Sequence, residues 1–125
     1  MNLLIDTHVL LWWLDDSPRL GRAGRTAIAD NQNFIAVSAA TAWEIAIKQA
    51  AGRLEAPADL LGAIDAEGFD PLPITFPHAR EAGALPRHHA DPFDRMLIAQ
   101  ARLEALTLVT ADPNIAHYDV AVLRP

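Results

Sequence analysis

The sequence predicts an α/β fold in which a parallel sheet carries helices on both faces. Short apolar runs alternate with longer stretches of helical periodicity along the whole chain, and no segment is repeated or low in complexity. This alternation is typical of successive βα units, whose strands lie parallel in one sheet. At 125 residues the chain has room for one domain, so we expect residues 1–125 to form a single folded unit.

Five short apolar runs, each bounded by turn residues or by a helical pattern, are predicted as strands. In chain order they span residues 3–6, 34–37, 72–74, 107–110 and 120–123. The longer stretches between them are predicted as helices. These span residues 7–14, 18–30, 38–52, 57–66, 77–84 and 91–105.

Local signals set several of the predicted helix ends. The run Asp15-Asp16-Ser17-Pro18 breaks the first helix. Ser38 is expected to cap the third helix and Gly52 to end it, and Asp91-Pro92 fits the cap and first position of the last one. One set of side chains in the third helix recurs at helical spacing and is predicted to be buried. It consists of Trp43, Ala46, Ile47 and Ala50.

Composition and charge exclude several classes of protein. The chain has no cysteine, so disulfides, thiolate zinc sites and cysteine nucleophiles are excluded, and any metal must be held by oxygen or imidazole. No run approaches the roughly 20 apolar residues that span a bilayer, and the N-terminus lacks a cleavable leader pattern, so we expect a cytoplasmic protein without a membrane partner. A net charge of -6 argues against a broad basic surface for duplex DNA. No glycine-rich phosphate loop or hydrolase triad is evident.

Four acidic residues lie where apolar segments meet a turn or a helix start: Asp6, Glu44, Asp94 and Asp112. Asp6 and Asp112 follow predicted strands, and the carboxyl ends of parallel strands are where sites form in such sheets. Carboxylate oxygens suit hard cations such as Mg²⁺ and Mn²⁺, which hold phosphate oxygens and activate water. Carboxylates gathered within a few ångströms repel one another, so they need a cation or raised pKa values. The four acids therefore predict a metal site for phosphoryl chemistry.

Each acid also has a purely structural interpretation, and these alternatives stay open at the level of sequence. Asp6 fits the cap of the helix that starts after it, and Asp112 fits a turn residue before Pro113. Glu44 is spaced to pair with Lys48 at i, i+4, and Asp94 is favoured by the dipole at its helix start.

Two residue pairs invite functional interpretations that we consider weaker. His88 and His89 are expected on an exposed loop, because adjacent histidines rarely bind one ion. Trp12 and Trp13 are expected to serve as core or interface anchors, in preference to stacking on bases.

The chain resembles the PIN-domain nucleases, and among them the VapC-type toxins of toxin–antitoxin pairs. Four segments carry the resemblance: LLIDTHVLLWWL at the start, SAATAWEIAIK, DPFDRMLIAQA and LTLVTAD near the end. The resemblance covers nearly the whole chain and implies a three-layer α/β/α sandwich with a central parallel sheet. It also implies hydrolysis of single-stranded RNA with Mg²⁺ or Mn²⁺ as cofactor.

The resemblance assigns the family's acids to Asp6, Glu44, Asp94 and Asp112, as metal ligands and catalytic residues. Asp91 is the alternative for the third acid, and the pair Ile98-Ala99 favours Asp94. Either Glu44 or Asp94 is expected to orient or deprotonate the attacking water. The resemblance further implies a homodimer and a cognate antitoxin, whose basic C-terminal segment lies over the acidic groove.

Alternatives from other classes are a non-toxin PIN nuclease, a catalytically silent binding module and a receiver-like signalling domain. A receiver-like domain requires an acid pair after its first strand and a lysine late in the chain, whereas Lys48 is the last lysine here. Retention of all four acids counts against the silent module.

Overall fold

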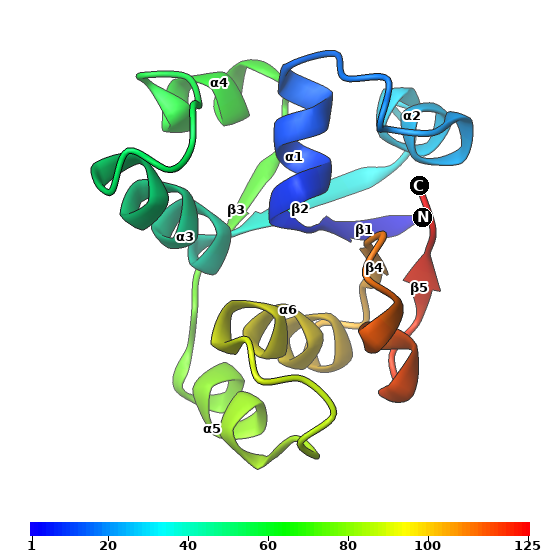
Figure 1. Cartoon of the computed structure of the whole chain (residues 1–125). Helices are drawn as coiled ribbons and strands as arrows, with labels where there is room; N and C mark the ends of the chain where they lie inside the picture. The colour runs from blue at the N-terminus through cyan, green and yellow to red at the C-terminus, as the bar shows by residue number, and fades with distance from the viewer.

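A single parallel sheet of five strands forms the centre of the molecule in the computed structural model, which describes residues 1–125 (Figure 1). The strands are β1 (Asn2–Ile5), β2 (Phe34–Ser38), β3 (Asp70–Leu72), β4 (Thr107–Val109) and β5 (Val122–Leu123). Their spatial order is β3-β2-β1-β4-β5, and every neighbouring pair is parallel. The prediction of a parallel sheet is confirmed, with each strand within two residues of its expected start.

All six predicted helices are present. They are α1 (Thr7–Leu14), α2 (Arg22–Ala29), α3 (Ala39–Ala50), α4 (Leu60–Ala66), α5 (Phe76–Ala84) and α6 (Pro92–Leu103), with a short 3₁₀ helix, η1 (Pro113–His117). Ser38 and Asp91 cap α3 and α6 as predicted, because each side chain accepts hydrogen bonds from free N–H groups of the first turn. The helices α2 and α4 begin later than predicted, at the residues that follow Gly21 and the cap Asp59.

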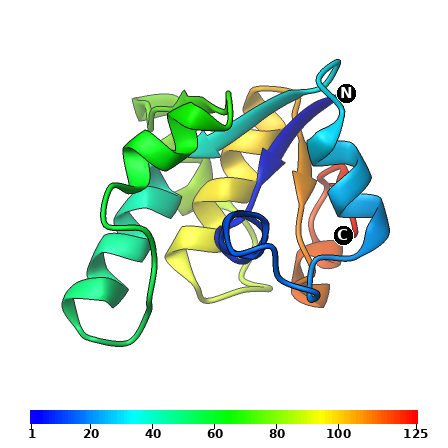
Figure 2. The same cartoon turned by 90° about the horizontal axis from the view of Figure 1, so that it is seen from above.

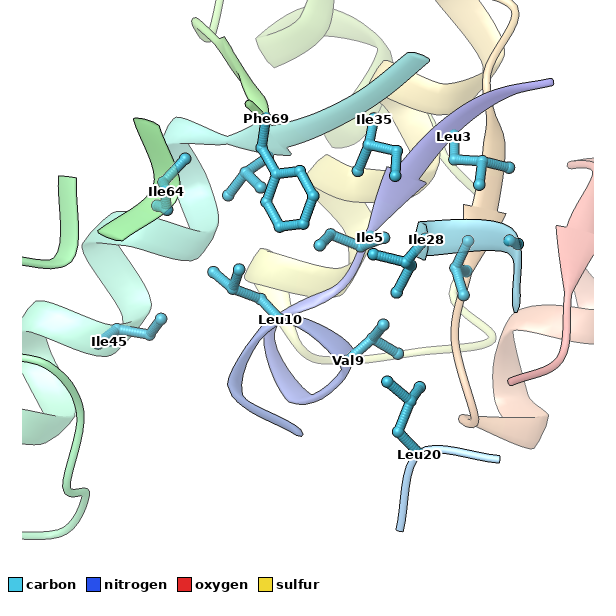
Figure 3. Close-up of a cluster of buried hydrophobic side chains, with 13 residues drawn as sticks. Leu3, Ile5, Val9, Leu10, Leu20, Ile28, Ile35, Ile45, Ile64 and Phe69 are labelled. Carbon is cyan, nitrogen blue, oxygen red and sulfur yellow. The ribbon is translucent and has the colours of Figure 1, made fainter. Parts of the chain in front are cut away.

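Alternating side chains of the strands build two separate cores, one on each face of the sheet. Leu3 and Ile5 of β1 join a cluster that α1, α2 and α4 cover (Figures 1 and 3). Leu4 belongs to the opposite cluster, beneath α6. α5 packs on the outside of α6 (Figure 1), and the view from above shows α6 behind β1 (Figure 2). Trp12 and Trp13 are half-buried against the first cluster. The fold is therefore the three-layer α/β/α sandwich expected of a PIN-like chain.

The predicted buried stripe of α3 is wrong. Trp43 and Ile47 are 60% and 44% exposed, and the buried side of the helix instead includes Thr41, Glu44 and Ile45. Helical spacing identifies an apolar face but not the direction in which it points. Here the polar side is turned inward because its groups find hydrogen-bond partners there, which removes most of the cost of burial.

The connectivity creates one distinctive position in the sheet. From β1 the chain moves to β2 on one side, and it later returns to β4 on the other side of β1. Ligand sites in open parallel sheets form at such a change of direction, outside the carboxyl ends of the strands. Asp6 follows β1, and Thr110 and Asp112 follow β4, so this edge brings them together. No helix is long and apolar enough to cross a membrane.

Candidate metal and catalytic site

Asp6 is buried between the end of β1 and the start of α1. Its N–H donates to the Val109 carbonyl at 3.1 Å, which ties it to the neighbouring strand β4. Its Oδ1 accepts a hydrogen bond from the Val9 N–H at 2.9 Å, so Asp6 caps α1. The structural interpretation of Asp6 is therefore correct, and it coexists with a position at the carboxyl edge of the sheet.

Asp112 reaches the same edge from β4. Its Oδ1 accepts from the Asn114 N–H at 2.9 Å and caps η1, while its own N–H donates to Thr110 Oγ1 at 3.1 Å. Its second oxygen, Oδ2, lies 2.8 Å from His89 Nε2. One oxygen of this carboxylate thus holds the turn, and the other faces the site.

Asp94 enters the site from the first turn of α6. Asp91 supplies the cap of that helix by accepting from the N–H groups of Phe93 and Asp94, so the Asp94 carboxylate is not needed for capping. Asp94 Oδ2 lies 3.0 Å from His89 Nε2. The two aspartates from α6 and from the end of β4 therefore converge on the same imidazole nitrogen.

His89 is the residue of the site that the sequence analysis missed. The expectation of an exposed loop is wrong for it, since its side chain is only 14% exposed and lies between Asp94 and Asp112. The Asp91 N–H donates to its Nδ1 at 3.1 Å, which orients the ring. The sequence offers one signal for this position, namely that His89 lies two residues before the cap Asp91. His88 does lie exposed, with its ring against Tyr118.

Glu44 is buried on the inner side of α3, and both of its oxygens are engaged. Thr7 Oγ1 donates to Oε1 at 2.6 Å, and Lys48 Nζ donates to Oε2 at 2.8 Å. The ion pair with Lys48 is thus present, as the structural interpretation predicted, but on a buried carboxylate. Thr7 directly follows Asp6, so Glu44 adjoins the site through this hydroxyl without joining the convergence on His89.

Asp94 and Asp6 have raised pKa values, because their charges are buried without enough positive charge nearby to balance them. Burial raises the pKa of Asp94 to about 7, and repulsion by Asp91, Asp6 and Asp112 adds to the rise while His89 opposes it. Burial also raises the pKa of Asp6 above its usual value, against hydrogen bonds from Thr110 and Val9. The pKa of Asp112 is lowered, because hydrogen bonds from Asn114 and His89 outweigh its partial burial.

The donor atoms fit a hard divalent cation. One oxygen of Asp94, one oxygen of Asp112 and a ring nitrogen of His89 all lie within 4.8 Å of one another. Two carboxylates at a partly exposed edge match the preference of Mg²⁺ and Mn²⁺ for oxygen ligands and retained water. A cation there would counter both causes of the raised pKa of Asp94, the burial of its charge and the repulsion by the other acids.

Comparison with known proteins identifies relatives over the whole fold. Residues 3–121 match the PIN domain family model. Ribonuclease VapC22 of Mycobacterium tuberculosis (strain ATCC 25618 / H37Rv) is 33% identical over 120 residues, which cover 94% of this chain and 92% of that protein.

Among solved structures, VapBC2 from Rickettsia felis bound to a DNA fragment from its promoter is similar with a TM-score of 0.72 at 15% identity, covering 98% of each chain. A toxin-antitoxin complex from Klebsiella pneumoniae is similar with a TM-score of 0.66 at 22% identity, covering 98% of this chain and 96% of that one. These similarities establish the fold.

We predict that the metal-free protein loses stability as the pH rises from about 4 to about 7. The pKa of Asp94 is 3.8 when unperturbed and about 7 in the fold, so the folded protein binds more protons in this interval. The lowered pKa of Asp112 acts below this interval. We expect the free energy of unfolding to fall by on the order of 1 to 2 kcal/mol, allowing for partial exposure. Urea unfolding in EDTA at pH 5 and pH 8 measures the change.

The matched control for this prediction is Asp94→Asn, whose neutral amide cannot titrate. The decline between pH 5 and pH 8 should shrink in this variant, with the remainder due mainly to Asp6. An equally steep decline in the variant would show that Asp94 is not the source.

Proposed function

Because this chain belongs to the PIN-domain family, we propose that it is a Mg²⁺- or Mn²⁺-dependent endoribonuclease that cleaves single-stranded RNA and acts as the toxin of a toxin–antitoxin pair. One observation carries the nuclease proposal: the carboxylates of Asp94 and Asp112 converge on one point at the sheet edge, beside the buried Asp6. The relative VapC22, which is named a ribonuclease, supports RNA as the substrate.

The proposed metal ligands and catalytic residues are Asp6, Glu44, Asp94 and Asp112. Asp94 and Asp112 offer oxygens at the edge itself, and Asp6 supplies negative charge from behind them. Of the four acids, Glu44 is the least available to a metal, because Thr7 and Lys48 already donate to its two oxygens. A bound divalent ion would supply an activated water and neutralise charge on the leaving oxygen. Of the two candidates for orienting that water, Asp94 is favoured, since it has no fixed partner other than His89.

We predict that Asp94→Asn and Asp6→Asn each reduce cleavage of single-stranded RNA to below about 1% of the wild-type rate. Each variant loses a carboxylate charge that would bind the metal, and the metal would be the only Lewis acid of the site. The loss of activity should therefore exceed the 10- to 100-fold typical of residues that contact only the ligands of a metal. Asn caps a helix about as well as Asp, so Asp6→Asn should keep α1 intact. Cleavage of a labelled RNA with Mg²⁺ or Mn²⁺, and with EDTA, provides the measurement.

Asp91→Asn is the matched control, because it changes an acid three residues away that serves as a cap. Its cleavage rate should stay within a few-fold of wild type. Wild-type activity in a folded Asp94→Asn protein would remove Asp94 from the proposed site, and activity that resists EDTA would refute metal dependence.

The proposed partner is a cognate antitoxin whose basic C-terminal segment lies over the acidic edge. A groove of about 580 Å³ runs beside the site and includes Leu11, Trp12 and Leu54 in its lining. His8 also lines it and lies close enough to Asp6 to oppose the rise that burial causes in the pKa of that carboxyl. The groove therefore offers apolar contacts next to the carboxylates. The net charge of -6 favours a basic segment, and Arg suits it because its guanidinium binds carboxylates in pairs.

We predict that expression of this chain alone arrests bacterial growth, and that co-expression of the small protein encoded beside it relieves the arrest and gives a stable complex. Trp12→Ala should weaken the complex at least about tenfold, since buried aromatic anchors dominate interfaces. Leu103→Ala, on an exposed part of α6, is the control and should bind as wild type. Growth that is unaffected by the wild-type chain would rule out the toxin role and favour a non-toxin nuclease or a binding module.

A homodimer is proposed through the exposed apolar side of α3. Trp43 and Ile47 lie on this side, and the Trp43 ring meets Phe93 of α6 edge-on with centroids 5.3 Å apart. The patch therefore joins two helices. Exposed aromatic and aliphatic side chains that form one surface are typical of interfaces.

We predict that Ile47→Glu converts the dimer to a monomer, because a charge at the centre of an apolar interface is costly to desolvate. Leu103→Glu is matched in exposure, at 47% against 44% for Ile47, and should leave the dimer intact. Light scattering coupled to size-exclusion chromatography measures both masses. A monomeric wild-type protein, or a dimer that survives Ile47→Glu, would contradict the assignment of this surface.

A further inference from the structure

The His89 side chain lies between two of the proposed metal ligands. Its Nε2 is 3.0 Å from Asp94 Oδ2 and 2.8 Å from Asp112 Oδ2. We infer that His89 is a positioning residue that bridges these two carboxylates in the metal-free protein, and that a divalent cation must displace it to bind. This inference rests on the proposed function, because it concerns the metal site of the nuclease.

The hydrogen bonds of the ring decide between a bridge and a metal ligand. The backbone N–H of Asp91 donates to His89 Nδ1 at 3.1 Å, so Nδ1 acts as an acceptor and carries no proton. A neutral imidazole then has its proton on Nε2, the atom that faces both carboxylates. A metal-bound histidine nitrogen must be unprotonated, with the proton on the other nitrogen donated to an acceptor. In this orientation His89 donates a hydrogen bond to Asp112 Oδ2, and Asp94 Oδ2 lies 3.0 Å from the same N–H group.

The bridge and the cation require the same space. Mg²⁺ binds carboxylate oxygens at about 2.0 to 2.1 Å. A cation held by the Asp94 and Asp112 carboxylates would compete with the Nε2–H group of His89, because this nitrogen lies 3.0 Å and 2.8 Å from their Oδ2 atoms. The two modes of neutralising the carboxylates are mutually exclusive, so the ring must move away when the ion enters.

The backbone around His89 is fastened independently of the carboxylates. The Arg95 guanidinium donates only to main-chain carbonyls at the end of α5 and in the following loop. They belong to Ala82 (2.9 Å), Leu85 (2.9 Å), Pro86 (3.0 Å) and His89 (3.3 Å). Arg95 lies one residue after Asp94, so the same turn of α6 fixes both the acid and the loop that carries the bridge. Displacement therefore needs rotation of the His89 side chain and no movement of the loop.

His88 provides a matched control. It is the adjacent residue of the same type, but its ring packs against Tyr118 with centroids 5.2 Å apart, and its backbone N–H donates to the Tyr118 hydroxyl. It makes no hydrogen bond to a carboxylate of the site. Substitution of His88 changes the same loop without removing the bridge.

The test is calorimetric titration of Mn²⁺ into four proteins at one fixed pH: wild type, His89→Ala, His89→Gln and His88→Ala. Without its competitor the ion should bind His89→Ala about 3- to 10-fold more tightly than wild type, which corresponds to about one net hydrogen bond. His89→Gln keeps a side-chain N–H donor and should lie between the two. His88→Ala should match wild type.

Thermal unfolding in EDTA gives a second readout. His89→Ala should melt below wild type without metal, since its carboxylates lose their bridge, and Mn²⁺ should raise its melting temperature by more than it raises that of wild type. Weaker Mn²⁺ binding by His89→Ala would overturn the inference and identify His89 as a ligand. Equal affinities would overturn it as well. If none of the four proteins binds Mn²⁺, the proposed metal site itself fails, whereas binding in the wrong order overturns only the bridge.

Discussion

The structure depends on one electrostatic constraint, the placing of several carboxylates at one partly desolvated edge of the sheet. Asp6 follows β1 and Asp112 follows β4, and these strands are neighbours because the chain reverses its direction of travel between them. The same topology that buries Leu3 and Leu4 on opposite faces thus forces acids together. As a consequence the pKa of Asp94 is raised to about 7, since its charge is disfavoured by burial and by the other acids.

Helix starts supply much of the compensation for this concentration of charge. Asp6 caps α1, Asp112 caps η1, and Asp94 lies in the first turn of α6. Asp6 and Asp112 therefore accept hydrogen bonds from free N–H groups, and Asp94 lies at the positive end of a helix dipole. Glu44 is neutralised differently, by the Thr7 hydroxyl and the Lys48 ammonium. His89 completes the set at the point where Asp94 and Asp112 meet, since it donates to Asp112 and lies 3.0 Å from Asp94.

The sequence predicts the sheet, its parallel strands and all six helices because those features follow from local periodicity and cap chemistry. The caps Ser38 and Asp91 are examples, since each needs only the residues that follow it. The orientation of α3 is not predictable in this way. Its buried side includes Glu44, which is tolerated there because Thr7, 37 residues earlier in the chain, donates to it. His89 was missed for the same reason, because its partner Asp112 lies 23 residues later. Both depend on contacts that local patterns do not encode.

The structural and functional interpretations of the acids turn out to be compatible, because a carboxylate has two oxygens. In Asp112, Oδ1 accepts from the Asn114 N–H to hold the turn, and Oδ2 faces His89. In Asp6, Oδ1 accepts from the Val9 N–H. A capping hydrogen bond of this kind fixes the side-chain rotamer, and the direction of the second oxygen is then fixed as well. Caps near a sheet edge consequently pre-organise ligands at no added conformational cost when a cation binds. For this reason an acid that satisfies every criterion of a helix cap is not thereby excluded from a metal site.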